Sequence, residues 1–445
     1  MLNKRYLLFN IPISRPSLKS YVLLFLVASL FFLPISSTGK SIFVTLSLIT
    51  ILLIPEYRTD LKTCFSLPWY QALLLFFAMI LVACLWSPAD IHTKWVVIEK
   101  YSKLLYLPIL ITGFRSSSTR MWGLHAFLLA ALITALLSIL KAHGFLEQFN
   151  IDPDQVFRNH IIAGLISAFA AYLSLWFYQQ TAFSQQLDFQ QDANEQADDN
   201  RVCNNASSCS PATTANAKHR SGKKWGYLLL SVIYSYHVLF INNGRTGYVI
   251  FIGLMLLLAL QIFSLKHAVL GILCIMGVTI VLFFQSPVMK AGLGAVYEDL
   301  TKYQQTDKNT AVGFRLQFHE FAHHLFNQHP IFGTGTGGFY YHFKQDNPVP
   351  VWGPVLLDPH SQYWLIAAEL GLLGMGIFLL FIFRLIQACL ALQHTKPIAL
   401  GILFAILLGG FSDSLIFYSS AGYFFILMIA LALSETPNKR VKTSA

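Results

Sequence analysis

The stretch SYVLLFLVASLFFLPI, residues 20–35, contains no charged side chain. An α-helix rises about 1.5 Å per residue, so a run of this kind approaches the ~30 Å thickness of a bilayer core. A helix also satisfies all of its backbone hydrogen bonds internally, which lipid requires. The stretch therefore predicts a membrane-spanning helix.

The rest of the chain repeats this pattern. Of its 445 residues, 55% are hydrophobic, 14% are aromatic and only 12% are charged, which is about half the charged share of a soluble domain. A water-soluble globule of this composition would have to expose most of its apolar side chains. The sequence thus predicts an all-α polytopic membrane protein and excludes a soluble fold.

Twelve apolar runs predict about twelve transmembrane helices. They lie at 20–35, 41–55, 67–86, 101–113, 122–142, 160–178, 225–241, 246–264, 267–285, 361–383, 397–411 and 418–434.

The distribution of Lys and Arg predicts the orientation, because cytoplasmic segments collect these residues. An even number of spans places both termini in the cytoplasm and gathers most basic residues there, including Lys4, Arg5, Arg15, Lys19, Arg58, Lys62, Arg115, Arg120, Lys218, Arg220, Lys223, Lys224, Lys266, Arg384, Lys396, Lys439, Arg440 and Lys442. The formal charge of +10 is then a topology signal, and no nucleic-acid partner is expected.

Two polar stretches divide the chain. Residues 181–224 are rich in Gln, Asn, Ser, Ala and Asp and predict a disordered cytoplasmic loop. Residues 286–360 combine aromatic residues with Gly, Pro and His in proportions that can fold, and predict one large outer loop. The predicted organisation is helices 1–6 in 1–180, the cytoplasmic loop 181–224, helices 7–9 in 225–285, the outer loop 286–360, and helices 10–12 with a cytoplasmic tail in 361–445.

The outer loop contains the segment GFRLQFHEFAHHLFNQHP, residues 313–330. Its spacing predicts an amphipathic helix on the outer membrane surface, ended by Pro330. Arg315 and His319 lie on a face beside the apolar stripe, which consists of Phe314, Phe318, Phe321 and Leu325.

Two motifs in this loop have alternative interpretations. HEFAH, residues 319–323, matches the H-E-x-x-H zinc motif, but no third ligand is evident, and interfacial histidines are the favoured interpretation. GTGTGG, residues 333–338, satisfies G-x-G-x-x-G but follows a helix rather than a strand. A flexible turn is favoured there, with an approach of bare backbone N–H groups to a phosphate as the alternative.

Three other residues suggest chemistry. Arg245, in INNGRTGYV (residues 241–249), lies in a very short predicted outer turn, and Arg315 and His360 are predicted on the same side of the membrane. Each alone could be an ordinary interfacial residue. Together, two guanidinium groups suit a departing diphosphate, and a neutral imidazole can take a proton from an attacking hydroxyl.

The order of these motifs resembles a known family. The arginine turn, the arginine before an amphipathic helix ending in HPIFGTGTGGF (residues 329–339), and HSQYWLIAAELGLLG (residues 360–374) are similar to those of the O-antigen ligase and polymerase superfamily of bacterial envelopes. With twelve predicted spans and one large outer loop, the chain most resembles its O-antigen ligases, whose architecture is like that of GT-C glycosyltransferases.

The resemblance implies transfer of a glycan from undecaprenyl diphosphate to a sugar hydroxyl of lipid A–core. The reaction would be inverting, independent of metal or cofactor, and located at the periplasmic face of the inner membrane. His360 would be the base, Arg245 and Arg315 would hold the diphosphate, and Lys100 and Lys103 would add to that site. Trp352, Tyr341 and Trp364 could offer aromatic faces to sugars, although anchoring at the membrane interface is favoured.

Other functions remain open. The O-antigen polymerase reaction and protein O-oligosaccharyl transfer belong to the same superfamily and differ in the acceptor. A transporter or flippase for anionic glycolipids would use the same cations, but it would be expected to show internal repeats.

Overall fold

The computed structural model of the chain describes residues 17–146, 152–202, 212–305 and 307–435, and every regular element in these ranges is helical. The α-helices are α1 (Leu18–Ile35), α2 (Ser37–Leu53), α3 (Pro55–Cys64), α4 (Pro68–Val82), α5 (Ile91–Ser102), α6 (Leu107–Gly113), α7 (Ser117–Ala142), α8 (His160–Val202), α9 (Ala212–Tyr236), α10 (Arg245–Ile262), α11 (Leu265–Gln285), α12 (Pro287–Gln304), α13 (Ala311–Gln328), α14 (Gly338–Asp346), α15 (Gln362–Leu390), α16 (Lys396–Gly409) and α17 (Ser419–Leu433). Short 3₁₀ or π segments are η1 (Ala83–Leu85), η2 (Lys103–Tyr106), η3 (Pro153–Gln155) and η4 (His237–Ile241).

Within these ranges, seven helices are long and apolar enough to cross a membrane. They are Leu18–Ile35, Pro68–Leu85, Ser117–Ala142, His160–Ala182, Arg245–Ile262, Lys266–Gln285 and Gln362–Leu390. Helices α2 and α3, taken together as one element with a 100° bend, are also long and apolar enough to cross a membrane. The predicted polytopic, all-helical class is therefore confirmed.

The other predicted spans are shorter or interrupted. Predicted span 101–113 contains the last two residues of α5, then η2 and the seven-residue α6. The 14 residues of α16 and the 15 of α17 reach only about 21–23 Å as helices. The basic residues Lys4, Arg5, Arg15, Lys439, Arg440 and Lys442 lie outside the described residues. The count of twelve spans and the location of the termini remain predictions.

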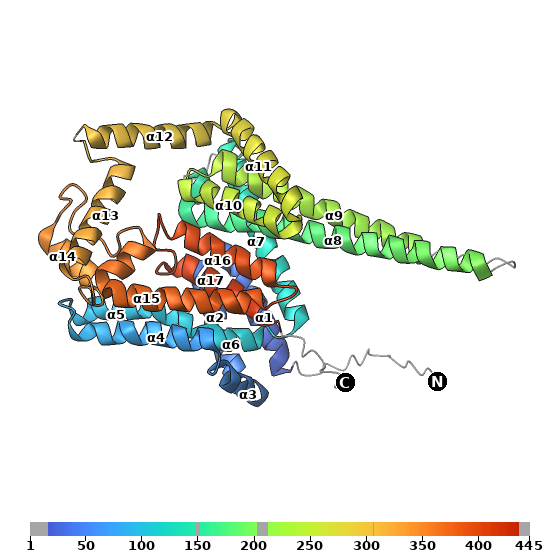
Figure 1. Cartoon of the computed structure of the whole chain (residues 1–445), viewed down its shortest axis with the longest axis horizontal. Helices are drawn as coiled ribbons and strands as arrows, with labels where there is room; N and C mark the ends of the chain where they lie inside the picture. The colour runs from blue at the N-terminus through green and yellow to red at the C-terminus, as the bar shows by residue number, and fades with distance from the viewer. Residues whose placement is uncertain (1–16, 147–151, 203–211, 306, 436–445) are drawn as a thin grey trace, which may run out of the picture.

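The two polar stretches lie at opposite ends of the helix bundle. Segments α12, α13 and α14, from the predicted outer loop, gather at the left of Figure 1, together with α5 and the start of α15. The paired helices α8 and α9 project beyond the right-hand end.

The predicted disordered loop at 181–224 is largely helical. Helix α8 continues to Val202 and α9 begins at Ala212, while 203–211 lie outside the described residues. The polar composition argues against burial in a core, but it does not argue against a helix, because Ala, Gln and Glu are good helix formers. A polar composition therefore does not by itself predict disorder.

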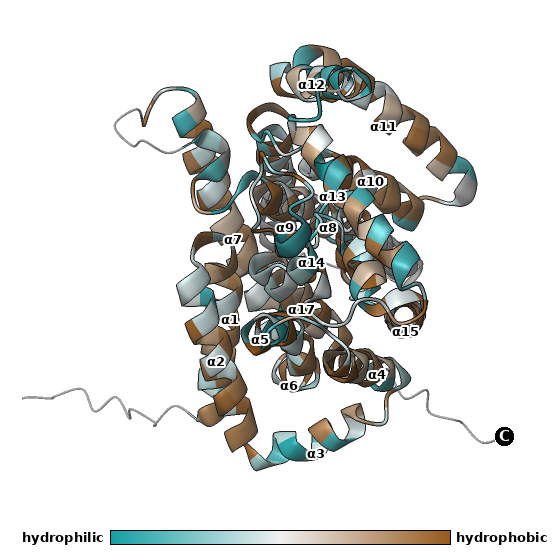
Figure 2. Ribbon diagram, turned by 90° about the vertical axis from the view of Figure 1, so that its left-hand side faces the viewer, coloured by the Kyte–Doolittle hydropathy of each residue, from teal (hydrophilic) through white to brown (hydrophobic). Residues whose placement is uncertain are grey.

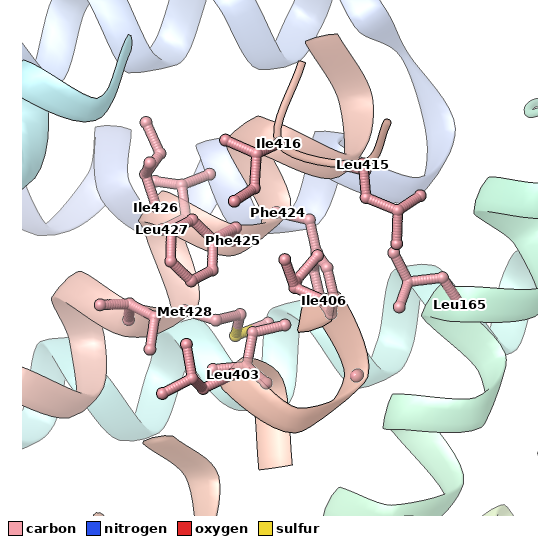
Figure 3. Close-up of a cluster of buried hydrophobic side chains, with 14 of the residues drawn as sticks. Leu165, Leu403, Ile406, Leu415, Ile416, Phe424, Phe425, Ile426, Leu427 and Met428 are labelled. Carbon is pink, nitrogen blue, oxygen red and sulfur yellow. The ribbon is translucent and has the colours of Figure 1, made fainter. Parts of the chain in front are cut away.

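The core of the bundle surrounds α17. Each α17 residue from Phe424 to Ala432 is buried, and the side chains in Figure 3 show Phe424 to Met428 packed beside Leu403 and Ile406 of α16 and Leu165 of α8. This packing fixes the loop between α16 and α17, which supplies part of the site below.

Helix α11 is the least enclosed of the candidate spans. Only 6% of its apolar stretch is buried inside the protein. Figure 2 shows α11 at the margin of the molecule, brown along most of its length. Leu270, Leu273 and Ile280 are each more than half exposed. An apolar face of this size is unstable in water and suits contact with lipid.

Candidate active site

Arg315 is presented by α13, the amphipathic helix predicted from the sequence. Thr310 caps the start of this helix by accepting a hydrogen bond from the backbone N–H of Gly313 at 3.1 Å. The helix ends at Gln328, just before Pro330, as predicted. Its predicted stripe is buried against the bundle at three positions, Phe318, Phe321 and Leu325.

His360 lies in the turn before α15, with its backbone in the left-handed region at φ 53°. Its backbone N–H donates to Oδ1 of Asp358 at 3.0 Å, which stabilises the turn. Its ring stacks on Phe318, with 5.9 Å between centroids and 25° between planes. Left-handed backbone at a residue with a side chain is uncommon and often marks a functional position.

Asp413 joins this histidine to the arginine of α13. Its side chain is fully buried, and its Oδ1 lies 3.4 Å from Nδ1 of His360 and 3.7 Å from Nη2 of Arg315. Its Oδ2 accepts a hydrogen bond from Thr246 at 3.1 Å. One carboxylate from the α16–α17 loop therefore holds the His, the Arg and the first turn of α10 together.

Asp413 was not among the residues predicted from the sequence. It is the only Asp or Glu between Glu369 and Glu435, in a six-residue loop between two apolar runs on the predicted outer side. An acidic residue isolated in this way near a titratable His was the available signal.

Tyr418 contacts the same nitrogen of the imidazole. Its hydroxyl lies 3.1 Å from Nδ1 of His360 and donates to Oδ1 of Asp358 at 3.4 Å. In the described part of the chain, Nε2 of His360 has no hydrogen-bond partner. The imidazole is thus held through Nδ1 and leaves Nε2 available.

A cavity of about 250 Å³ opens between α10, α13 and the turn before α15. Its lining includes Arg245, Arg315 and His360, and also Trp352, whose ring meets Phe318 edge-on at 5.1 Å. The three predicted residues, spread over more than a hundred positions, therefore face one space. Trp352 adds an aromatic face to it.

Arg245 begins α10 and is the less satisfied of the two arginines. Its Nη1 is buried and has no hydrogen-bond partner, and neither has the nearby hydroxyl of Tyr248. A buried guanidinium nitrogen without a partner is costly. Its position in the cavity wall suits an incoming anion.

One stretch of the chain is similar to a known protein family. Residues 230–379 match the family model described as O-antigen ligase. The match covers less than half of the chain and shows a similarity to this family over that stretch. The match includes Arg245, Arg315 and His360, whereas Asp413 and Tyr418 lie beyond it. No curated protein matches the sequence. Members of the family are glycosyltransferase-like enzymes that act on polyprenyl-linked glycans.

Lys100 and Lys103, which the sequence predicts at the phosphate site, do not line the cavity of the arginines. Lys103 is buried and donates from Nζ to the carbonyl oxygens of Phe417 and Tyr418, at 3.1 and 2.9 Å. Lys100 is half-buried, with Nζ 5.9 Å from the centre of the Phe417 ring. Both lie on the other side of Tyr418.

A second, more apolar cavity of about 510 Å³ shares the two arginines with the first. It lies between α10, α12, α13 and α16, and its apolar lining includes Val249, Ile250 and Leu316. Arg245 and Arg315 therefore stand between a polar cavity that contains His360 and an apolar one.

The HEFAH motif does not assemble a metal site. His319 Nε2 lies 3.4 Å from the carbonyl oxygen of His360, whereas Glu320 contacts Tyr303 and the His323 ring meets Trp364 edge-on. The described residues contain no group of three or more His, Cys, Asp or Glu placed to hold a metal ion. Of the three motif residues, only His319 contacts the candidate site.

The GTGTGG loop, residues 333–338, has a structural role. The backbone N–H groups of Thr334 and Gly335 donate to the carbonyl oxygens of Ala368 and Glu369 in α15, at 2.9 and 2.8 Å. These two carbonyl oxygens lie just before a break in α15 at Gly371, where φ is 64°. These N–H groups are used within the protein, so the loop is a packed turn and not a flexible one, and they are not available to a phosphate.

Burial changes the proton affinity of two groups beside His360. It lowers the pKa of His319 below 6.5, and the charge of Arg315 lowers it further. Burial also raises the pKa of Asp358. His319 therefore stays neutral close to Arg315 and adds no further positive charge at neutral pH.

Proposed function

We propose that this protein transfers a glycan from undecaprenyl diphosphate to a sugar hydroxyl of lipid A–core, at the periplasmic face of the bacterial inner membrane. The observation that carries the proposal is the convergence of Arg245, Arg315 and His360 on one cavity. The family match supports the same class of reaction.

His360 is the proposed general base. The buried carboxylate of Asp413 accepts a hydrogen bond from Nδ1–H, which leaves the lone pair of Nε2 for the acceptor hydroxyl. Asp413 also stabilises the imidazolium that forms. Help from a positioned base of this kind contributes about 10²–10⁴ in rate.

Arg245 and Arg315 are the proposed diphosphate ligands. Charge develops on the leaving diphosphate as the glycosidic bond breaks, and each well-placed donor contributes about 3–4 kcal/mol to its stabilisation. The unpartnered Nη1 of Arg245 would gain its missing hydrogen bond. The apolar cavity beyond the arginines would take the first isoprene units of the carrier.

The bond changes follow from these roles. The acceptor oxygen bonds to the anomeric carbon and gives its proton to Nε2 of His360. The bond from that carbon to the diphosphate oxygen breaks, and its electron pair leaves with the diphosphate. Attack from the face opposite the leaving group inverts the anomeric carbon. No metal is required to neutralise the leaving group because two guanidinium groups do so.

Ligase chemistry is preferred to polymerase chemistry because the matched family model is described as O-antigen ligase. The two reactions share a donor and differ in the acceptor. Surface glycolipid from a deletion strain separates them on a gel. Free core without ladder bands supports the ligase, whereas core carrying a single repeat unit supports the polymerase.

The central test replaces His360 with Ala in protein reconstituted with lipid-linked glycan and acceptor. Transfer should fall by about 10²–10⁴, and transfer at the wild-type rate would refute the base role. The control is His324→Ala, an exposed histidine on α13 away from the cavity. EDTA should leave the rate of transfer unchanged. A loss of transfer in EDTA would favour a metal-dependent reaction.

A further inference from the structure

A second group of cations lies on the other side of Tyr418 from the arginines. It comes from four segments, α2, α5, η2 and the turn before α8. Lys40 is 0% exposed, Lys103 3% and Arg158 9%, while Lys100 is half-buried. We call these four residues the lysine cluster.

Only neutral groups solvate these cations directly. Lys40 Nζ donates to the hydroxyl of Ser419 at 3.3 Å and lies 4.1 Å from the centre of the Tyr423 ring. Arg158 donates to the carbonyl oxygen of Leu33 at 2.7 Å. In the described part of the chain, no member of the cluster forms an ion pair with a carboxylate.

The members of the cluster repel one another. The charges of Arg158 and Lys100 both act on Lys40, and those of Lys100 and Lys40 act on Lys103. Among the described residues, Glu99 is the acidic side chain whose charge acts on Lys103. Buried charges without an opposite charge cost free energy. Such an arrangement is stabilised when an anion binds.

The start of α17 adds to the positive potential. Helix α17 begins at Ser419, and no side chain caps its first N–H groups. The positive end of a helix favours anions. Because Lys40 contacts the hydroxyl of Ser419, the buried ammonium and the helix terminus meet at one point. Ser419 is exposed and Lys100 is half-buried, so an anion can approach from the surface.

The position of the cluster relates it to the candidate base. Tyr418, directly before Ser419, has its hydroxyl 3.1 Å from Nδ1 of His360. Its carbonyl oxygen receives the ammonium of Lys103 at 2.9 Å. Tyr418 therefore contacts the imidazole through its hydroxyl and the lysine cluster through its carbonyl oxygen.

We infer that the lysine cluster binds a phosphate group carried by the lipid acceptor. Lys100 and the first turn of α17 make the contact, and the buried Lys40 and Arg158 add positive charge behind them. The inference rests on the proposed function, in which the arginines hold the donor diphosphate. Separate sites hold two anionic lipids without competition for one pair of arginines.

The first experiment measures transfer by reconstituted wild-type protein and by Lys100→Gln, with donor and acceptor varied in turn. The KM for a phosphorylated acceptor should rise about tenfold, while the KM for the donor and kcat change less than twofold. Lys94→Gln, on the same helix but outside the cluster, is the control and should match wild type. An unchanged acceptor KM in Lys100→Gln, or an equal rise in the donor KM, overturns the inference.

A second arm uses an acceptor from which the phosphates have been removed. With this acceptor, the KM of wild type should rise about tenfold. The KM of Lys100→Gln, which already lacks the contact, should rise little further. A full further loss in the variant contradicts a shared contact. Lys40→Met gives an independent measurement when its melting temperature in detergent matches wild type.

A third arm identifies the source of the phosphate. Vesicles containing phosphatidic acid should bind wild type more tightly than Lys100→Gln, whereas vesicles of phosphatidylcholine alone should not distinguish them. Inorganic phosphate, at the same concentration as the phosphatidic acid, should not displace the phosphatidic acid vesicles from wild type. Displacement by inorganic phosphate shows a site for free anions and contradicts a lipid-borne ligand.

The two proposals fail in different ways. If wild type transfers no glycan, the proposed function fails, and the vesicle arm still decides whether the cluster binds a phosphorylated lipid. If wild type transfers glycan and Lys100→Gln has an unchanged acceptor KM, only this inference fails.

Discussion

Oδ1 of Asp413 lies 3.4 Å from Nδ1 of His360. The same oxygen lies 3.7 Å from Nη2 of Arg315. A carboxylate that orients the candidate base thus also faces a candidate diphosphate ligand. The carboxylate helps to keep Arg315 in place before an anion binds. It also connects the proposed base, His360, to a proposed diphosphate ligand.

Asp413→Asn should reduce the rate of transfer by about 10²–10⁴. The Asn amide can donate to Nδ1, which would place the imidazole proton on Nε2, where it blocks the acceptor hydroxyl. The measurement is kcat with saturating donor and acceptor. Asp346→Asn, an exposed position at the end of α14, is the matched control. A kcat within threefold of wild type would show that the carboxylate does not set the tautomer.

Tyr418→Phe should have a much smaller effect. It removes one hydroxyl from Nδ1 of His360 and from Asp358 and leaves Asp413 in place. A net hydrogen bond is worth about 0.5–1.5 kcal/mol, so kcat should fall about 2- to 12-fold. A loss as large as that of Asp413→Asn would instead assign the Tyr hydroxyl a direct part in proton transfer.

Gly422→Ala should destabilise the protein through Lys103. A Cβ at Gly422 would lie closer than 3.0 Å to Cε and Nζ of Lys103, which would displace the ammonium from its two carbonyl partners. An unsatisfied buried polar group costs about 1–3 kcal/mol, and a charged one more. The melting temperature in detergent should fall accordingly.

The control for this change is Gly376→Ala in α15, where a Cβ meets nothing within 4 Å. Ala at a helix interior is favoured over Gly by about 0.5–1 kcal/mol. Its melting temperature should therefore equal or exceed that of wild type. Equal losses in both variants would mean that the effect at Gly422 does not depend on Lys103.

His319 should make stability fall in acid. Its pKa in the folded protein lies below the ordinary value of 6.5 because of burial, so the folded state binds fewer protons than the unfolded state below that pH. The free energy of unfolding therefore falls as pH decreases from about 6.5 to the folded pKa and then levels off. Melting temperatures of wild type and His319→Gln between pH 5 and 8 measure this. The loss in wild type should exceed that in the variant, and parallel curves would contradict the assignment.

The sequence by itself determined the solvent and the class of fold. Apolar runs such as 20–35 have one stable solution in lipid, a helix, and the spacing of Phe318, Phe321 and Leu325 predicted α13 and its buried face. It also identified Arg245, Arg315 and His360 as candidates, because permanent cations and a titratable group are conspicuous in an apolar chain.

Only the tertiary structure decided which side chains meet. Asp413 was overlooked because its importance comes from a distance to His360, 53 positions away in sequence, and local periodicity contains no such information. The position of Lys103 could not be predicted for the same reason. Because α17 packs against η2, Nζ of Lys103 donates to backbone carbonyl oxygens and does not line the cavity of the arginines. Periodicity reports which face of a helix is apolar, whereas contact between helices depends on how their side chains fill space together.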